Sequence, residues 1–165
     1  MDWRRPWNAL RVQISSITHD PARVMEKPYR QSFTIQGRDF CSAGGASTEI
    51  KAILKDLGID PVVVRRVAIA TYEAEMNVVM YADRAELALE ITPQAIRIHV
   101  NDTGPGIPNI DLAMQEGYST ATPEMREMGF GAGMGLPNIK RNSDGLTITS
   151  VEGKGTTLDI TFHIN

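Results

Sequence analysis

Apolar and polar residues alternate along several stretches of the chain, as is typical of strands with one buried face. A first strand is expected over residues 31–37. Two pairs of strands joined by short turns follow, over residues 86–92 with 95–101 and over residues 145–152 with 156–164. Short turns of this kind connect antiparallel neighbours, so each pair predicts a β-hairpin.

Two other stretches follow the helical period. Residues 43–57 place isoleucine and leucine at helical spacing, and Gly58 ends that pattern. Asp60 followed by Pro61 is a favoured helix start, and we expect this second helix to run to about Tyr81. Because the second helix is apolar over much of its surface, we expect it to be largely buried.

The predicted order is a strand, two helices, a hairpin, a loop with a short helix, and a second hairpin. A mostly antiparallel sheet covered on one face by helices accommodates this order, which makes the fold class an α/β (α+β) two-layer sandwich. Residues 1–27 show no sustained period and are expected to form a flexible N-terminal arm, with the folded domain over 28–165. An upstream start codon chosen in error is the alternative explanation of residues 1–24, with Met25 as the true start.

Composition narrows the functional class. The chain has 165 residues, of which 42% are hydrophobic, and this suits one domain with a single core. A formal net charge of -3 gives no sign of nucleic-acid binding. The single cysteine, Cys41, excludes an internal disulfide and fits a reducing cytosol. No apolar run approaches the roughly 20 residues that a membrane helix needs, so we expect a cytoplasmic protein.

Residues 101–142 combine a carboxylate with two sets of glycines. The segment contains Asp102, then Gly104 and Gly106, then Gly129, Gly131, Gly133 and Gly135. Glycine lets backbone N–H groups approach phosphate oxygens, and the N-terminus of a following helix, expected over 136–142, favours negative charge. We interpret the segment as two glycine hinges that hold a polar lid over a nucleotide, with ordinary surface loops as the alternative.

Two better-known phosphate-binding loops are excluded. The chain contains no G-x-x-x-x-G-K-[ST], so it has no P-loop. The second glycine set reads GFGAGMG, which lacks the G-x-G-x-x-G spacing of dinucleotide-binding folds and does not directly follow a strand-like run.

Glu73 and Asn77 lie four residues apart on the long apolar helix, so their side chains share one face. Burial without partners costs roughly 1–3 kcal/mol for each group. A hydrogen-bonded pair in the core is one explanation. The other is a magnesium and phosphate site, in which Asn77 offers an oxygen to Mg²⁺ and Glu73 positions or deprotonates an attacking hydroxyl or water. Glu75 is expected to point to another face and to be solvated.

The order of these motifs resembles the Bergerat-fold, or GHKL, ATP-binding superfamily. The motifs are E-x-x-x-N on a helix, D-x-G-x-G-I, a glycine-rich lid end and a late G-T, carried here by Glu73, Asn77, Asp102, Gly104, Gly106, Ile107, Gly129 to Gly135, Gly155 and Thr156. The resemblance covers about residues 27–165. Within the superfamily the chain is most similar to the anti-sigma-factor serine/threonine kinases, closest to the stressosome switch-kinase branch. It departs from the family at Tyr81, where a histidine is frequent.

The resemblance implies that ATP and Mg²⁺ are the cofactors. It implies that Asp102 accepts a hydrogen bond from the adenine amino group with Thr156 nearby, that Asn77 holds Mg²⁺, and that Glu73 is the catalytic base. The remaining nucleotide-binding positions that it implies are Gly104, Gly106, Ile107, Gly129, Gly131, Gly133, Met134, Gly135 and Leu136. Arg126 in the lid is a candidate contact to the γ-phosphate, because a guanidinium binds phosphate oxygens bidentately; a solvated lid charge is the alternative.

By resemblance, we expect a protein serine/threonine kinase that phosphorylates a STAS-domain antagonist protein in a partner-switching pathway. A STAS-domain protein, a sigma factor or both are the expected partners, without direct contact to nucleic acid or membrane, and a homodimer is left open. The alternative is a nucleotide-gated anti-sigma or switch protein with little or no kinase activity. Glu73 favours the kinase, since a module that only binds needs no base. A fragment of a sensor histidine kinase is less favoured, because no phosphoacceptor histidine on a dimerising helix precedes the domain.

Overall fold

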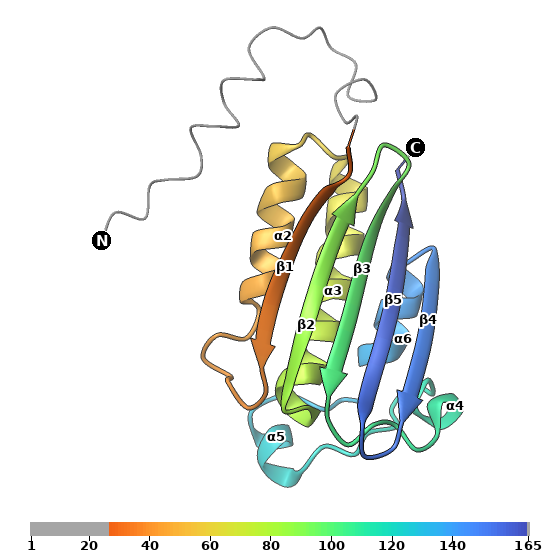
Figure 1. Cartoon of the computed structure of the whole chain (residues 1–165). Helices are drawn as coiled ribbons and strands as arrows, with labels where there is room; N and C mark the ends of the chain where they lie inside the picture. The colour runs from red at the N-terminus through yellow and green to blue at the C-terminus, as the bar shows by residue number, and fades with distance from the viewer. Residues whose placement is uncertain (1–26, 165) are drawn as a thin grey trace, which may run out of the picture.

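The computed structural model describes residues 27–164 as one antiparallel sheet with helices packed on one face (Figure 1). The five strands lie in the order β1-β2-β3-β5-β4, and every neighbouring pair is antiparallel. Their bounds are Tyr29–Gln36 (β1), Arg84–Ile91 (β2), Ala95–Thr103 (β3), Gly145–Val151 (β4) and Gly155–His163 (β5). The two-layer α/β prediction and both predicted hairpins are therefore confirmed.

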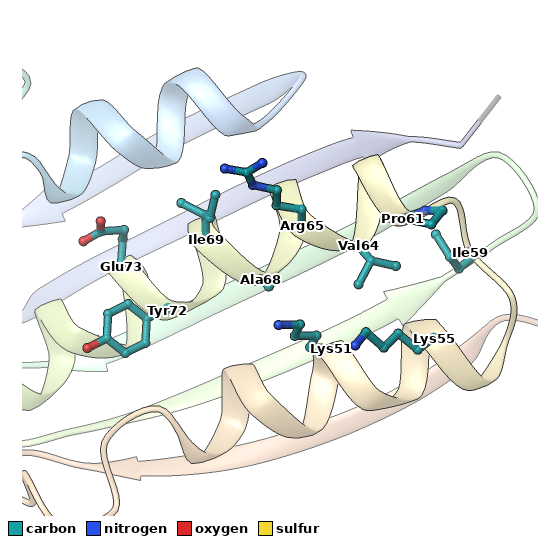
Figure 2. Close-up of a pocket in the computed structure, with 10 residues that line it drawn as sticks. All are labelled: Lys51, Lys55, Ile59, Pro61, Val64, Arg65, Ala68, Ile69, Tyr72 and Glu73. Carbon is teal, nitrogen blue, oxygen red and sulfur yellow. The ribbon is translucent and has the colours of Figure 1, made fainter.

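Three longer helices form the second layer: α2 (Gly45–Asp56), α3 (Pro61–Tyr81) and α6 (Gly135–Asn142). The central helix is α3, which packs against α6 and runs beside α2 (Figure 2). Its predicted start is confirmed, because the Asp60 carboxylate accepts a hydrogen bond from the backbone N–H of Val62 at 2.8 Å. Helix α2 begins two residues later than the predicted 43, since Gly44 adopts a left-handed backbone with φ 88°.

The core lies between the sheet and α3. Alternate residues of the strands face the helices and are fully buried, among them Leu87, Leu89, Ile91, Ile96, Ile98, Ile160 and Phe162. From α3, Val67, Ala70 and Ala74 are buried as well, as its apolar surface predicts. Burial of each large side chain contributes about 1.5–3 kcal/mol, so this alternation fixes which face of the sheet the helices cover.

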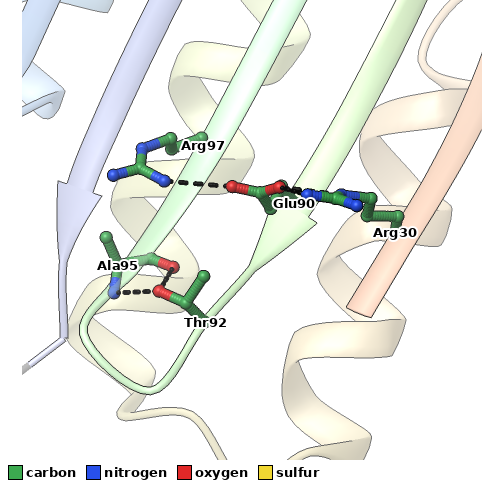
Figure 3. A network of polar contacts seen from close by, with 5 residues as sticks. All are labelled: Arg30, Glu90, Thr92, Ala95 and Arg97. Carbon is green, nitrogen blue, oxygen red and sulfur yellow. Dashed lines mark hydrogen bonds and ion pairs between the residues drawn. The ribbon is translucent and has the colours of Figure 1, made fainter. Parts of the chain in front are cut away.

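The opposite face of the sheet carries polar residues on neighbouring strands. Glu90 on β2 lies between two arginines, 2.7 Å from Arg30 on β1 and 3.0 Å from Arg97 on β3 (Figure 3). His99 on β3 and Asp159 on β5 form a similar cross-strand pair at 2.7 Å. These pairs keep the outer face hydrophilic, so the helices pack on the other, apolar face of the sheet.

Two short helices, which were not predicted from the sequence, lie within the segment predicted to be a polar lid. They are α4 (Ile110–Ala113) and α5 (Pro123–Glu127). The Asn109 side chain caps α4 through the backbone N–H of Leu112, and the Thr122 side chain caps α5 in the same way. Helices of one turn are too short to produce a periodic pattern. Only the capping residues Asn109 and Thr122 could have indicated them in the sequence.

Glu75 is buried, and the prediction that it is solvated was wrong. The residue is only 2% exposed. Its carboxylate accepts hydrogen bonds from the backbone N–H groups of Gly44, Ala46 and Ser47, at 3.0, 3.1 and 3.0 Å. These donors belong to the start of α2, whose own capping residue makes no side-chain hydrogen bond. The N–H groups at a helix start have no partner within the helix, so the Glu75 carboxylate and the first turn of α2 satisfy one another.

The predicted N-terminal arm, residues 1–27, lies outside the described part of the chain except for its last residue. The arm and the start-codon alternative for residues 1–24 therefore stay predictions. Among the helices that the structure describes, none is both long and apolar enough to span a bilayer.

Candidate active site

Asp102 marks one end of the candidate site. It is the penultimate residue of β3, is half-buried, and accepts a hydrogen bond from the backbone N–H of Thr156 on β5 at 3.0 Å. Burial raises the pKa of the Asp102 carboxyl; the Thr156 hydrogen bond opposes this rise, and the nearby Asp83 carboxylate adds to it. Within residues 27–164, the second carboxylate oxygen accepts no hydrogen bond, so it is free to accept one from a ligand amino group.

The backbone passes unusually close to Asp102. A Cβ on Gly155 would lie 2.1 Å from the Asp102 carbonyl oxygen, which is far inside any normal contact. A Cβ on Gly104 would lie 2.9 Å from the Cα of Ala82 and 3.2 Å from the Asp102 carboxylate. Side chains at either glycine would therefore displace the carboxylate from its position.

Ser150 on β4 joins the loop after Asp102 to β5. Its hydroxyl accepts a hydrogen bond from the backbone N–H of Ile107 at 2.7 Å and lies 2.8 Å from the hydroxyl of Thr156. Gly106, the neighbour of Ile107, lies against Val151, because a Cβ there would lie 2.4 Å from the Val151 carbonyl oxygen. The predicted positions from Asp102 to Ile107 and Thr156 thus form one connected wall.

Glu73 and Asn77 mark the other end of the candidate site, on α3. They do not pair with one another. The amide of Asn138, on α6, donates to Glu73 Oε1 at 2.7 Å. A Cβ on Gly135, also on α6, would lie 3.1 Å from Asn77 Oδ1 and 3.7 Å from Glu73 Oε2. The structure therefore brings a carboxylate, an amide oxygen and the first turn of a helix together.

The first turn of α6 offers backbone donors to an anion. The helix begins at Gly135, one residue before the predicted start, with Met134 as a capping residue that makes no side-chain hydrogen bond. Leu136 and Pro137 are buried and fix the helix against the core. Uncapped N–H groups and the helix dipole favour negative charge at this end, as a phosphate requires.

The second glycine set folds the lid back on itself. Gly133 has a left-handed backbone with φ 73°, and a Cβ there would lie 2.5 Å from the carbonyl carbon of Gly117. The Gly133 carbonyl accepts a hydrogen bond from the Gly117 N–H at 2.9 Å. Gly129 and Gly131 are also left-handed. These contacts tie the two halves of the lid together beside the first turn of α6.

The lid also rests on the rest of the domain. Phe130, between two of the glycines, stacks on Phe40 of the β1–α2 loop with ring centroids 5.6 Å apart. Met125 of α5 is buried against the core. Glu116 forms an ion pair with Arg141 of α6. In this conformation the lid is held down by packing at several points.

Arg126 is exposed on α5, and its guanidinium forms no ion pair with any residue in the described range. No hydrogen bond or ion pair within residues 27–164 joins its side chain to Glu73 or Asn77. Its role at the γ-phosphate stays a prediction.

Two residues with defined contacts in the site were missed by the sequence argument. Asn138 orients Glu73, and its signal was its place in the first turn of the helix that follows the glycines. Ser150 joins the wall around Asp102, and it carries no signal beyond its place in an alternating strand.

The residues present fit a magnesium–nucleotide complex. At the Asp102 end, a half-buried carboxylate offers a free acceptor oxygen. At the Glu73 end, an amide oxygen suits a hard cation, and backbone donors at the α6 terminus suit the phosphates that share the cation. Because residue 135 is a glycine, the space beside the side chains of Asn77 and Glu73 stays open.

Comparison with known proteins gives a family and several relatives. Residues 63–165 match the family described as histidine kinase-, DNA gyrase B- and HSP90-like ATPase. The serine/threonine-protein kinase RsbT of Bacillus subtilis (strain 168) is 33% identical over 108 residues, which cover 63% of this chain and 75% of that protein. The anti-sigma F factor of Caldanaerobacter subterraneus subsp. tengcongensis is 32% identical over 114 residues, which cover 64% of this chain and 76% of that protein.

Two further similarities concern parts of longer proteins. The sensor histidine kinase GtrS of Pseudomonas aeruginosa is 39% identical over 61 residues, or 36% of this chain and 12% of GtrS. A crystal structure of the RsbU and RsbW domains of a Mycobacterium tuberculosis protein superposes with a TM-score of 0.53 at 14% identity, covering 84% of this chain and 32% of that one. The latter similarity shows the shared fold.

Proposed function

This chain belongs to the histidine kinase-, DNA gyrase B- and HSP90-like ATPase family, and from that premise we propose that it is a protein serine/threonine kinase of the anti-sigma or switch type. Its substrate would be a STAS-domain antagonist protein in a partner-switching pathway. The observation that carries the proposal is the cluster of Glu73, Asn77 and Asn138 at the N-terminus of α6. The similarity to the kinase RsbT supports the reaction type.

Asp102 is the proposed adenine anchor. Its free carboxylate oxygen accepts from the adenine amino group, while its other oxygen is held by the Thr156 N–H. Gly104, Gly106 and Ile107 form the wall beside the base. The hydrogen bond from the adenine amino group to Asp102 favours adenine over guanine. Guanine carries a carbonyl oxygen at the same ring position, and that oxygen would face the Asp102 carboxylate as a second acceptor.

Asn77 is the proposed protein ligand of Mg²⁺, which would neutralise charge on the phosphates when bound. The phosphates would lie at the N-terminus of α6, with Gly129, Gly131, Gly133, Met134, Gly135 and Leu136 forming the lid end around them. Arg126 would contact the γ-phosphate from α5. Backbone donors and one amide oxygen supply the positioning on which phosphoryl transfer depends.

Glu73 is the proposed general base. Its Oε1 is held by the Asn138 amide, which leaves Oε2 to accept a proton from the hydroxyl of the substrate protein. Glu73 takes the hydroxyl proton as the hydroxyl oxygen bonds to the γ-phosphorus and the bond to the leaving ADP oxygen breaks. The products are ADP and a phosphorylated serine or threonine.

A nucleotide-gated anti-sigma or switch protein with little kinase activity is the second candidate. The similarity to an anti-sigma F factor favours it. In that case the nucleotide would set the position of the lid, which packs on Phe40 and α6, and the lid would select the partner. Both candidates would act in the cytoplasm, as a monomer or a homodimer.

The test is transfer of labelled γ-phosphate from Mg-ATP to purified STAS-domain proteins of the organism that encodes this chain. The proposal predicts transfer by the wild type and loss of both Mg-ATP binding and transfer in Asn77→Ala. Tight Mg-ATP binding by the wild type without transfer would favour the nucleotide-gated binding protein. Failure to bind ATP would contradict both candidates.

A further inference from the structure

A groove of about 780 Å³ lies between α2 and α3 and reaches Glu73 at one end (Figure 2). Its other end lies at Pro61, where α3 begins. Pro61 and Glu73 are twelve positions apart on α3, so the groove is about 18 Å long at a helical rise of about 1.5 Å per residue. It therefore connects the proposed base to a surface on the helix layer, away from the Asp102 wall.

The floor of the groove is apolar and partly open to solvent. Ile69 is partly exposed, and Tyr72 is 42% exposed on the same helix. Near the Pro61 end, the α2–α3 connection also exposes Leu57 (40%) and Val62 (67%), which do not line the groove itself. An apolar groove with a polar rim is a common form of protein contact site.

The sides of the groove are positively charged. Lys51 and Lys55 lie one turn apart on α2, and Arg65 lies on α3. None of these three cations forms an ion pair with a residue between 27 and 164. The chain as a whole has a net charge of -3, so the groove is a local basic surface on an acidic protein. Such a surface favours partners with carboxylates around an apolar patch.

We propose that this groove is the docking site for the protein substrate, and that the substrate presents an acidic, partly apolar surface next to its acceptor hydroxyl. The inference rests on the proposed function, because it uses Glu73 as the base at the end of the groove. A partner seated along α2 and α3 meets Lys51, Lys55 and Arg65 with its carboxylates. The same placement brings its hydroxyl to Glu73.

A second copy of this chain is a poorer occupant. A two-fold contact through the groove would bring the same cations of both copies face to face. Like charges at short range oppose association, whereas an acidic surface is attracted.

The test measures binding separately from transfer. The probe is the purified STAS-domain protein of the same organism that accepts phosphate or binds most tightly in the transfer test above, titrated against the Mg-ADP-bound protein. Lys51→Glu/Lys55→Glu reverses two groove charges, and Lys140→Glu/Lys154→Glu makes the same change at two exposed lysines that do not line the groove. Tyr72→Ser removes apolar surface without a change of charge.

We expect the groove double variant to weaken binding of the probe by about tenfold or more. In the transfer reaction it raises KM for the probe to a similar extent and leaves kcat and KM for ATP unchanged. Tyr72→Ser weakens binding several-fold by loss of apolar contact, and the control double variant stays within about twofold of the wild type. Lys51→Gln/Lys55→Gln gives the same readout should charge reversal impair folding.

Equal binding by the wild type and the groove variants would overturn the docking site, whether or not phosphate is transferred. Absence of any binding between the wild type and the probe would overturn it as well. Binding that depends on the groove without any transfer would support the docking site and contradict only the kinase activity. Self-association lost in the groove variant, with probe binding intact, would assign the groove to a second copy instead.

Discussion

At the scale of single residues, Gly135 keeps open the space beside Asn77 and Glu73 that is proposed to hold the phosphates. A Cβ on it would lie 3.1 Å from Asn77 Oδ1, within the space that the proposed Mg²⁺ and phosphates need. Gly135→Ala should therefore weaken Mg-ATP binding by about tenfold or more, because Asn77 must move or the phosphates must shift. Titration with Mg-ATP at constant pH measures the effect.

Gly45→Ala is the matched control for Gly135→Ala. Gly45 also begins a helix, α2, and a Cβ on it would meet nothing within 4 Å. The control should bind Mg-ATP like the wild type. Equal affinity in both variants would show that the phosphates do not lie beside Gly135.

Glu75 is a structural carboxylate rather than a catalytic one. It satisfies three backbone donors at the start of α2 and so fixes α2 to α3. Glu75→Gln should lower the free energy of unfolding by roughly 2–3 kcal/mol, because a neutral amide accepts fewer and weaker hydrogen bonds from these donors. Urea denaturation followed by circular dichroism measures the loss.

The exposed Glu152 offers the same substitution without buried partners. Glu152→Gln should change the free energy of unfolding by less than about 0.5 kcal/mol. A loss of similar size in both variants, or in neither, would remove the role given to Glu75.

At the scale of elements, Asp144 joins three parts of the fold. It lies between α6 and β4, bonds the Arg66 guanidinium of α3 at 2.6 Å, and accepts from the His163 N–H of β5 at 2.7 Å. Its bond with Arg66, followed by that with His163, holds the pKa of the Asp144 carboxyl below its usual range. Asp144→Asn should destabilise the protein by about 1 kcal/mol at pH 7.

The direction of the pKa shift fixes the pH dependence of that loss. Because the folded-state pKa is depressed, the Asp144 carboxylate contributes its full stability above the unfolded value of about 3.9. The contribution disappears as pH falls through the lower folded-state pKa. Urea denaturation at pH 7 and pH 3 should show the wild type losing its advantage over Asp144→Asn on acidification. An advantage that stays constant would show that this contact is not charge-dependent.

The sequence predicted the long elements better than the short ones. The alternation of β2 and β3 and the Asp60–Pro61 start of α3 are strong local signals, and both are confirmed. The one-turn helices α4 and α5 were missed because four or five residues cannot show a period. The burial of Glu75 was missed because its partners belong to another helix, about 30 residues earlier in the chain.

At the scale of the whole molecule, the site is assembled from segments that are distant in sequence. Glu73 and Asn77 could be chosen from their spacing on one helix face, and Asp102 from its place after a strand. The contact between Asn138 and Glu73 joins residues 65 apart and depends on how α6 packs on α3. The groove likewise depends on the packing of α2 against α3, so no local motif predicts it.

The central claim is that Glu73 removes a proton during phosphoryl transfer. Glu73→Gln tests it most directly, since glutamine keeps an oxygen to accept the Asn138 hydrogen bond but cannot act as a base. We predict that Glu73→Gln binds Mg-ATP within about twofold of the wild type and transfers phosphate to the STAS-domain protein about 10²- to 10⁴-fold more slowly. Transfer at the wild-type rate would contradict the assignment of Glu73 as the base and, with it, the account of this site.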